Sequence, residues 1–155
     1  MPGVSKMTAA VGLTVGVELT AAQAARQAAR LAGVRPELAA AYGVALRRWL
    51  AEPKLQALGR PFVSEGHRSA AEQDALYAQG RTEPGTVVTY KRGGESKHNA
   101  WPSRALDVAF LGADGAVSWA PALLARFAGL MKGADTRVRW GGDWPGFRDR
   151  PHFEV

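Results

Sequence analysis

The chain has 155 residues, of which 46% are hydrophobic and 22% are charged. These proportions are typical of one folded domain, and they exclude a disordered tail protein and a collagen-like repeat. The chain contains no cysteine, which excludes disulfides, cysteine–zinc clusters and thiol catalysis. Any transition metal would therefore be bound by the three histidines and fourteen acids.

The net charge of +6 is concentrated in the N-terminal part of the chain. Residues 1–60 hold eight bases against three acids, whereas the remaining 95 residues hold twelve against eleven. Such an excess either forms a solvated helix face or makes weak contact with an anionic surface. No helix-turn-helix, zinc-finger or aromatic RNA-binding signature accompanies the bases, so we expect no nucleic-acid partner. We expect the chain to be a monomer.

The first 19 residues contain one lysine, Lys6, and a weakly apolar run that Glu18 interrupts. A signal peptide needs a more basic start and an uninterrupted apolar core. No stretch of the sequence approaches the ~20 apolar residues that span a bilayer. We therefore interpret residues 1–19 as a flexible leader and residues 20–155 as a single domain.

Helix signals recur along this domain. Helices are predicted over residues 20–32, 36–52, 55–58, 69–79 and 118–133. Two of them begin with capping boxes, in which Thr20 is followed by Gln23 and Ser69 by Glu72. Ser118 is predicted to cap the last helix. Residues 81–97 contain turn formers and charges without periodicity, and a loop of this length usually carries function or disorder.

Short apolar segments between the helices predict strands. They cover residues 61–64, 104–111, 137–140 and 152–155, and the turn at Asp114-Gly115 returns the chain after the second strand. In that strand, alternation places Leu106, Val108 and Phe110 on one face. Helices that precede and interrupt a small antiparallel sheet predict the α+β class.

Asp107 lies on the other face of this strand, between two alanines. A buried carboxylate is costly unless it is paired or binds a metal. One interpretation is a salt bridge to an arginine. The other uses His98, at the end of the long loop, and His152, at the start of the last strand. Two imidazoles and one carboxylate match the three protein ligands of a catalytic zinc whose fourth position holds water.

Five short motifs occur in order along the chain. They are SEGHRS at 64–69, SKHN at 96–99, SRALD at 103–107, WGGDW at 140–144 and DRPHFE at 149–154. With these motifs, residues 33–155 resemble the zinc peptidases of bacterial cell walls that include D-alanyl-D-alanine carboxypeptidases and dipeptidases. The chain looks most similar to the L-alanyl-D-glutamate endopeptidases that bacteriophages use as endolysins.

The resemblance implies one zinc ion held by His98, Asp107 and His152, on the small sheet. It also implies a general base at Asp149, three residues before the last ligand. On a regular strand, positions 149 and 152 would face opposite ways. Because Pro151 disfavours a regular ladder there, we expect a bend that returns Asp149 to the metal.

Four residues are candidates for substrate contact. Arg68 matches a family arginine that approaches the substrate carbonyl or carboxylate, and its alternative role is to pin the following helix to the sheet. Ser96 matches a family serine that contacts substrate near the first ligand, or it is simply a turn residue. Trp140 and Trp144 either form the floor of a peptide-binding groove or belong to the core.

Two further acids lie near the last strand. Asp143 is a rival to Asp149 as the base; otherwise it orders its loop or supports the site. Glu154 falls on the same side of the strand as His152 and is a candidate to orient that imidazole, a role that a backbone carbonyl would fill equally well.

The chain departs from the family pattern at two places. Residues 100–103 lengthen the connection from His98 to Asp107 to nine, which puts the geometry of this pair in question. His67 stands where the family usually has an aromatic or aliphatic residue, and an ordinary loop histidine, a substrate contact and an alternative ligand all remain open for it.

The resemblance implies a zinc-dependent peptidoglycan hydrolase that cleaves the L-alanyl-D-glutamate bond of the stem peptide. The alternatives are a D-alanyl-D-alanine carboxypeptidase or dipeptidase on the same scaffold, and a non-catalytic peptidoglycan-binding module. The short chain and the aromatic motif at 140–144 favour the endopeptidase. Without a clear signal peptide, we expect synthesis in the cytoplasm of a bacterial host and action on the cell wall.

Overall fold

The computed structural model describes residues 16–155. The predicted leader, 1–19, therefore lies largely outside the described residues. Within the described part, no helix is both long and apolar enough to cross a membrane.

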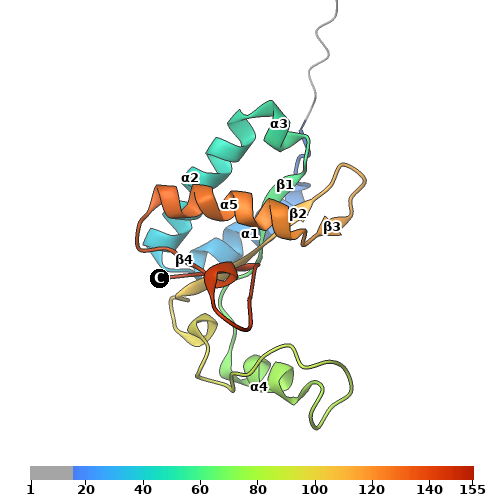
Figure 1. Cartoon of the computed structure of the whole chain (residues 1–155), viewed down its shortest axis with the longest axis vertical. Coiled ribbons are helices and arrows are strands. Elements are labelled where there is room, and N and C mark those ends of the chain that lie inside the picture. The colour runs from blue at the N-terminus through green and yellow to red at the C-terminus, as the bar shows by residue number, and fades with distance from the viewer. Residues whose placement is uncertain (1–15) are drawn as a thin grey trace, which may run out of the picture.

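Three helices precede the first strand, and further helices separate most of the later strands (Figure 1). In order they are α1 (Ala21–Ala32), α2 (Pro36–Ala51), α3 (Pro53–Gln56), β1 (Arg60–Glu65), α4 (Ala70–Ala78), η1 (Lys97–Asn99), β2 (Ala105–Leu111), β3 (Val117–Ser118), α5 (Pro121–Ala134), β4 (Arg139–Trp140), η2 (Gly141–Asp143) and β5 (His152–Glu154).

The five strands form one antiparallel sheet in the order β1-β2-β5-β4, and the short β3 pairs with the end of β2. Asp107 on β2 pairs with His152 on β5 and, beyond a register shift in β1, with Glu65. The α+β class predicted from the sequence is confirmed.

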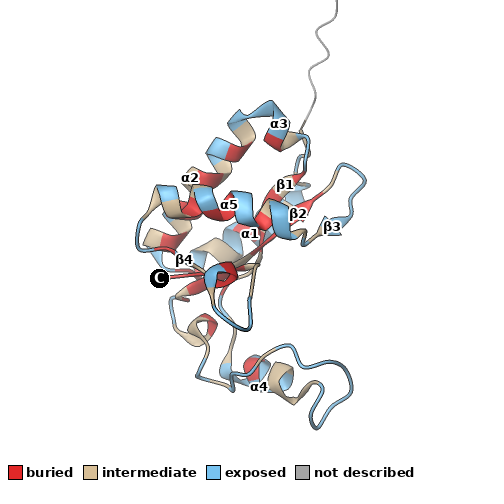
Figure 2. Cartoon of the chain, in the orientation of Figure 1, coloured by how far each residue is buried: buried red, intermediate tan, exposed pale blue. Residues whose placement is uncertain are grey.

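Helices α2 and α5 bury one face of this sheet. Leu106, Val108 and Phe110 of β2 point into the core that these helices close, as the alternation predicts. Phe127 of α5 lies edge-on to Phe110, and Trp49 of α2 contacts both rings. Buried residues accordingly gather where α2, α5 and the strands meet (Figure 2). Burying each large side chain stabilises the fold by about 1.5–3 kcal/mol, which fixes β2 and, on its opposite face, Asp107.

Helix α1 covers the free edge of β1. The Gln27 side chain donates to the Val63 carbonyl at 2.6 Å and accepts from the Val63 N–H at 2.7 Å. Because β1 is the outermost strand, these backbone groups have no strand partner, and the buried amide of Gln27 supplies both hydrogen bonds.

Helix α4 and residues 79–96 form a lobe that projects from the rest of the fold (Figure 1). The buried Gln73 of α4 ties the long segment to the helix, because its amide donates to the Lys91 carbonyl at 2.8 Å and to the Thr89 hydroxyl at 3.3 Å. Its carbonyl oxygen accepts from Arg68 at 2.9 Å. The predicted long loop is therefore held in place beside Arg68.

The capping boxes at Thr20 and Ser69 are both present. Two details differ from the sequence prediction. Helix α3 begins at Pro53, which suits a first helical position, rather than at residue 55. Ser118 belongs to β3, and its hydroxyl accepts from the Ala120 N–H. Since Ala120 is the N-cap residue of α5, no side chain caps that helix.

Candidate active site

Three side chains from separate segments converge on one point. His98 lies in η1, Asp107 lies on β2, and His152 opens β5. His98 Nε2 is 3.2 Å from both Asp107 Oδ1 and His152 Nδ1, and His152 Nδ1 is 3.4 Å from Asp107 Oδ1. Both imidazoles are buried. The structure therefore brings together the three ligands predicted from the sequence.

The spacing of these atoms fits a tetrahedrally bound metal. Ligand atoms about 2.0–2.1 Å from a tetrahedral ion lie about 3.3 Å from one another, and the three observed separations agree. Among residues 16–155, this is the one group of three histidine, aspartate or glutamate side chains arranged to hold a metal ion. The donor set suits a transition metal better than magnesium or calcium, which prefer oxygen ligands.

Neighbouring acceptors orient both imidazoles. His98 Nδ1 lies 2.6 Å from the Gly66 carbonyl, and because a carbonyl only accepts, Nδ1 is the donor of this bond and Nε2 is the nitrogen that faces the site. His152 Nε2 lies 2.9 Å from Glu154 Oε2, and Lys97 Nζ lies 2.9 Å from the other oxygen of that carboxylate. Glu154 thus has the geometry to fix the His152 ring.

The cluster perturbs the ionisation of its members. Burial raises the pKa of Asp107, but hydrogen bonds from His152 and His98 outweigh it and hold the pKa well below its usual range. Burial lowers the pKa of His152, yet its hydrogen bonds to Asp107 and Glu154 raise the pKa to about 9. For Glu154, hydrogen bonds from His152 and Lys97 overcome burial and lower the pKa to about 2.

The longer connection from His98 to Asp107 is accommodated outside the cluster. Ser103 is buried, where its N–H donates to the Gly33 carbonyl and its carbonyl accepts from Arg35. The inserted segment therefore packs beside the end of α1, and the 3.2 Å separation of His98 and Asp107 is maintained.

Asp149 lies in a turn immediately before β5. Its carbonyl accepts from the His152 N–H at 3.2 Å and its own N–H donates to Gly141 at 3.1 Å, so the expected bend is present. A side chain at Gly141 would overlap the Asp149 carbonyl, and glycine is therefore required for this close approach. Burial, and next the charge of Asp107, raises the pKa of Asp149.

A cleft of about 590 Å³ opens beside the cluster. It is lined by Arg68, Leu76, Gln79, Val88, Thr89, Tyr90, Lys91, Ser96, His98, Asp107, Trp119, Trp144, Phe147, Asp149 and His152. The cleft thus combines the ligand cluster, the predicted base and three of the four predicted substrate residues. Its remaining walls come mainly from the α4 lobe and the turn before β5.

Arg68 and Ser96 line the cleft and also support local structure. Arg68 donates to Gln73 at 2.9 Å and lies 3.4 Å from Glu65, so it also pins α4 as the alternative interpretation proposed. The Ser96 hydroxyl accepts from the His98 N–H at 3.3 Å and caps η1. Each side chain therefore occupies a fixed position at the cleft wall.

Three candidates lie outside the cleft. Trp140 packs against the core and donates to the Arg150 carbonyl, so its position agrees with the core alternative and not with a groove floor. Asp143 is exposed and pairs with Lys132 at 2.7 Å. His67 lies edge-on to the exposed Trp101, away from the ligand cluster.

The sequence gives no signal for several aromatic residues of the cleft. Tyr90, in the long loop, and Phe147, before β5, lie edge-on with ring centroids 5.5 Å apart. Their side chains are among the most exposed large apolar groups of the described chain, at 68% and 54%. The contact between Tyr90 and Phe147 joins the two loops that border the cleft. Neither loop has a periodic sequence pattern that would have predicted this contact.

No protein-family model matches the chain. A search of curated proteins finds the peptidoglycan L-alanyl-D-glutamate endopeptidase CwlK of Bacillus subtilis, 40% identical over 104 residues that cover 60% of this chain and 59% of the relative. Among solved structures, the L-Ala D-Glu endopeptidase ChiX of Serratia marcescens matches with a TM-score of 0.60 and 26% identity over 93% of both chains. The chain is thus similar to two L-alanyl-D-glutamate endopeptidases, one in sequence and one in fold.

The similarity to these two endopeptidases agrees with the fold and with the order of the site motifs. The match to ChiX extends over nearly the whole chain, so the sheet and its surrounding helices are common to both structures. The chain spans somewhat more than half the length of CwlK.

Proposed function

We propose that this protein is a zinc-dependent L-alanyl-D-glutamate endopeptidase that hydrolyses the stem peptide of peptidoglycan. The observation that carries the proposal is the convergence of His98, Asp107 and His152 within 3.4 Å of one another, with Asp149 in the same cleft. Two relatives described as endopeptidases for this bond support the choice of substrate.

The residues of the cleft have separate tasks in this reaction. A bound zinc ion would polarise the scissile carbonyl and lower the pKa of an attacking water toward ~7. Asp149 accepts the proton of that water and then delivers it to the leaving amine. Its raised pKa suits both transfers, because a base whose pKa lies closer to neutral also returns the proton more readily.

Arg68 binds negative charge on the substrate. A guanidinium has five N–H donors, and the contacts to Gln73 and Glu65 use two of them, which leaves donors for a carbonyl or carboxylate. Lys91 is the other lysine or arginine among the cleft residues. Two cations suit a substrate that contains a D-glutamyl carboxylate, and Ser96 and Trp144 contribute a hydroxyl and an aromatic surface.

The proposed substrate places the site of action in the cell wall. A phage origin, synthesis in the cytoplasm of the host and a monomeric state stay predictions from the sequence. The non-catalytic alternative requires the loss of a ligand or the base, and all four side chains are present.

Digestion of purified sacculi, followed by identification of the new termini, tests the proposal. We expect a new glutamate amino terminus that appears with the wild-type protein and not with Asp149→Asn. Release of free D-alanine would identify a carboxypeptidase and contradict the proposal. Binding to sacculi without any cleavage would identify a non-catalytic module.

A further inference from the structure

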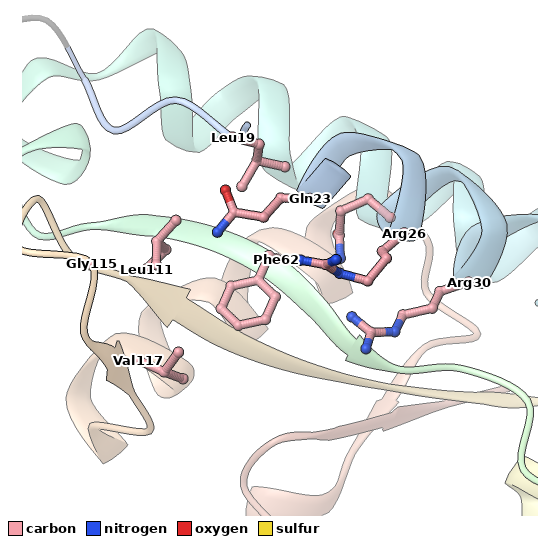
Figure 3. A pocket seen from close by; sticks show the side chains of 9 residues that line it. Leu19, Gln23, Arg26, Arg30, Phe62, Leu111, Gly115 and Val117 are labelled. Carbon is pink, nitrogen blue, oxygen red and sulfur yellow. The ribbon is translucent and has the colours of Figure 1, made fainter. Parts of the chain in front are cut away.

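A second hollow, of about 270 Å³, lies between α1, β1 and the turn that joins β2 to β3 (Figure 3). Arg26 and Arg30 of α1 line one side of it, and Phe62, Leu111 and Val117 line the other. No residue of the catalytic cleft belongs to this hollow. It combines two positive charges with an apolar wall.

The two arginines are one helical turn apart and carry like charges. Figure 3 shows both side chains directed from α1 toward β1. Arg30 is half-buried, and its guanidinium donates to the Val63 carbonyl at 2.9 Å, which fixes its position. Among residues 16–155, neither arginine takes part in an ion pair. Like charges at this spacing repel each other, so an anion in the hollow would relieve the repulsion.

The apolar wall restricts the kind of anion. Phe62 pairs with Ala109 of β2, two residues before Leu111 on the same face of that strand, and Val117 is 50% exposed at the rim. A bare inorganic anion would leave this surface in contact with water. A ligand that carries carboxylates next to small apolar groups satisfies both sides of the hollow, and an acidic peptide has that chemistry.

The hollow and the cleft are neighbours on the sheet. Alternation places Leu111 of the hollow and Asp107 of the cluster on the same face of β2, and four residues of strand span about 13 Å. Val117 lines the hollow and Trp119, two residues later, lines the cleft. A polymer bound in the cleft can therefore extend into the hollow.

We propose that this hollow binds a second acidic peptide of the peptidoglycan polymer whose first stem occupies the cleft. The inference rests on the function proposed above. Arg26 and Arg30 pair with the carboxylates of this second stem, in the bidentate geometry that guanidinium groups favour. Phe62, Leu111 and Val117 contact its methyl groups. The site raises affinity for the polymer and leaves the chemistry at the metal unchanged.

The test compares two variants that lose the same charge. One is Arg26→Gln/Arg30→Gln, and the control is Arg47→Gln/Arg48→Gln, which removes two exposed arginines from α2. Both are made in the full chain with Asp149→Asn, so that sacculi are bound and not digested. We expect the dissociation constant for purified sacculi to rise about tenfold in the first variant and less than twofold in the control. The single variant Arg26→Gln preserves the hydrogen bond from Arg30 to Val63. It should still lose part of the affinity for sacculi.

Turnover by enzymes with Asp149 intact separates this inference from the proposed function. With sacculi, Arg26→Gln/Arg30→Gln should raise KM and leave kcat unchanged; with a soluble single stem peptide, both constants should equal those of the wild type. Equal losses of sacculus binding in both charge variants, or no loss in either, would overturn the inference. Binding to anionic lipid vesicles that needs Arg26 and Arg30, without such binding to sacculi, would also overturn it. If sacculus binding needs Arg26 and Arg30 but no peptide is cleaved, the hollow is supported and the endopeptidase proposal fails.

Discussion

Asp107 and His152 stand directly opposite each other on the neighbouring antiparallel strands β2 and β5. Directly paired residues of an antiparallel ladder point to the same face, with Cβ atoms about 4.5–5.5 Å apart. The strand register therefore brings two of the three proposed ligands together. A slip of one residue would turn Asp107 toward the core face, so the packing of Leu106 and Val108 against the helices also secures the proposed metal site.

Replacing the proposed base should separate catalysis from metal binding. We expect Asp149→Asn to lower kcat at least ~100-fold, because the amide cannot accept the proton of the attacking water. Its metal content should equal that of the wild type. The matched control is Asp143→Asn, which removes an exposed partner of Lys132 and should leave activity nearly unchanged. Turbidity clearing of sacculi beside metal analysis measures both; near-normal clearing by Asp149→Asn would refute its role.

The contact of Glu154 with His152 should strengthen metal binding. Loss of an acid that orients a ligating imidazole typically lowers metal affinity about 10–100-fold. We therefore expect Glu154→Gln to raise the dissociation constant for zinc within that range, measured by competition with a chelator. Unchanged affinity would show that the carboxylate does not orient the ring.

Metal affinity should increase as the pH rises from 7 to 9. In the metal-free protein, burial lowers the pKa of His152 but hydrogen bonds to Asp107 and Glu154 raise it to about 9. Below that pH the ring is protonated, and the proton must leave before the nitrogen can bind metal. The affinity should therefore rise about tenfold per pH unit and level off above pH 9. Titration calorimetry in buffers of different ionisation enthalpy would detect the released proton, and a pH-independent affinity would contradict the prediction.

A methyl group at Gly141 should disturb the turn that holds Asp149. The added Cβ would overlap the Asp149 carbonyl, so we expect Gly141→Ala to destabilise the fold by about 1–3 kcal/mol and to lower kcat. The control is Gly129→Ala in α5, where a Cβ meets open space and should stabilise the helix by about 0.5–1 kcal/mol. Urea unfolding measures both changes. Equal stability of the two variants would mean that the turn adapts without cost.

The contact between Tyr90 and Phe147 should contribute to substrate binding. Both rings line the cleft, and an edge-on aromatic pair is worth about 0.5–1.5 kcal/mol beyond its buried area. We expect Tyr90→Ala and Phe147→Ala each to raise KM for a stem peptide several-fold, with a coupling energy of that size in the double variant. Trp101→Ala, which removes an exposed aromatic outside the cleft, should leave KM unchanged; a similar rise there would refute the assignment.

The features that depend on local sequence were predictable. Capping boxes at Thr20 and Ser69 begin helices as expected, and alternation in β2 places Asp107 opposite the core. The convergence of His98, Asp107 and His152 was expected from their chemistry and from the motif order, and the structure places them together. In contrast, the cleft-facing role of Tyr90 and Phe147 depends on how two irregular loops fold back, and no local pattern encodes that.

Tryptophan residues illustrate the same limit. Trp140 and Trp144 belong to one motif, yet Trp144 lines the cleft while Trp140 packs against the core. Both residues are tryptophan, which is large and amphipathic, so residue type alone cannot distinguish a core position from a cleft position. The distinction arises from β4, which pairs Trp140 with Phe153 in the sheet and ends before Trp144.

Zinc stoichiometry tests the central claim most directly. The wild-type chain, stripped of metal and then dialysed against micromolar zinc, should bind one ion per chain. His98→Ala and His152→Ala, shown by circular dichroism to keep their fold, should bind almost none under the same conditions. A wild-type chain that binds no zinc, or histidine variants that still bind one ion, would contradict the account of this site.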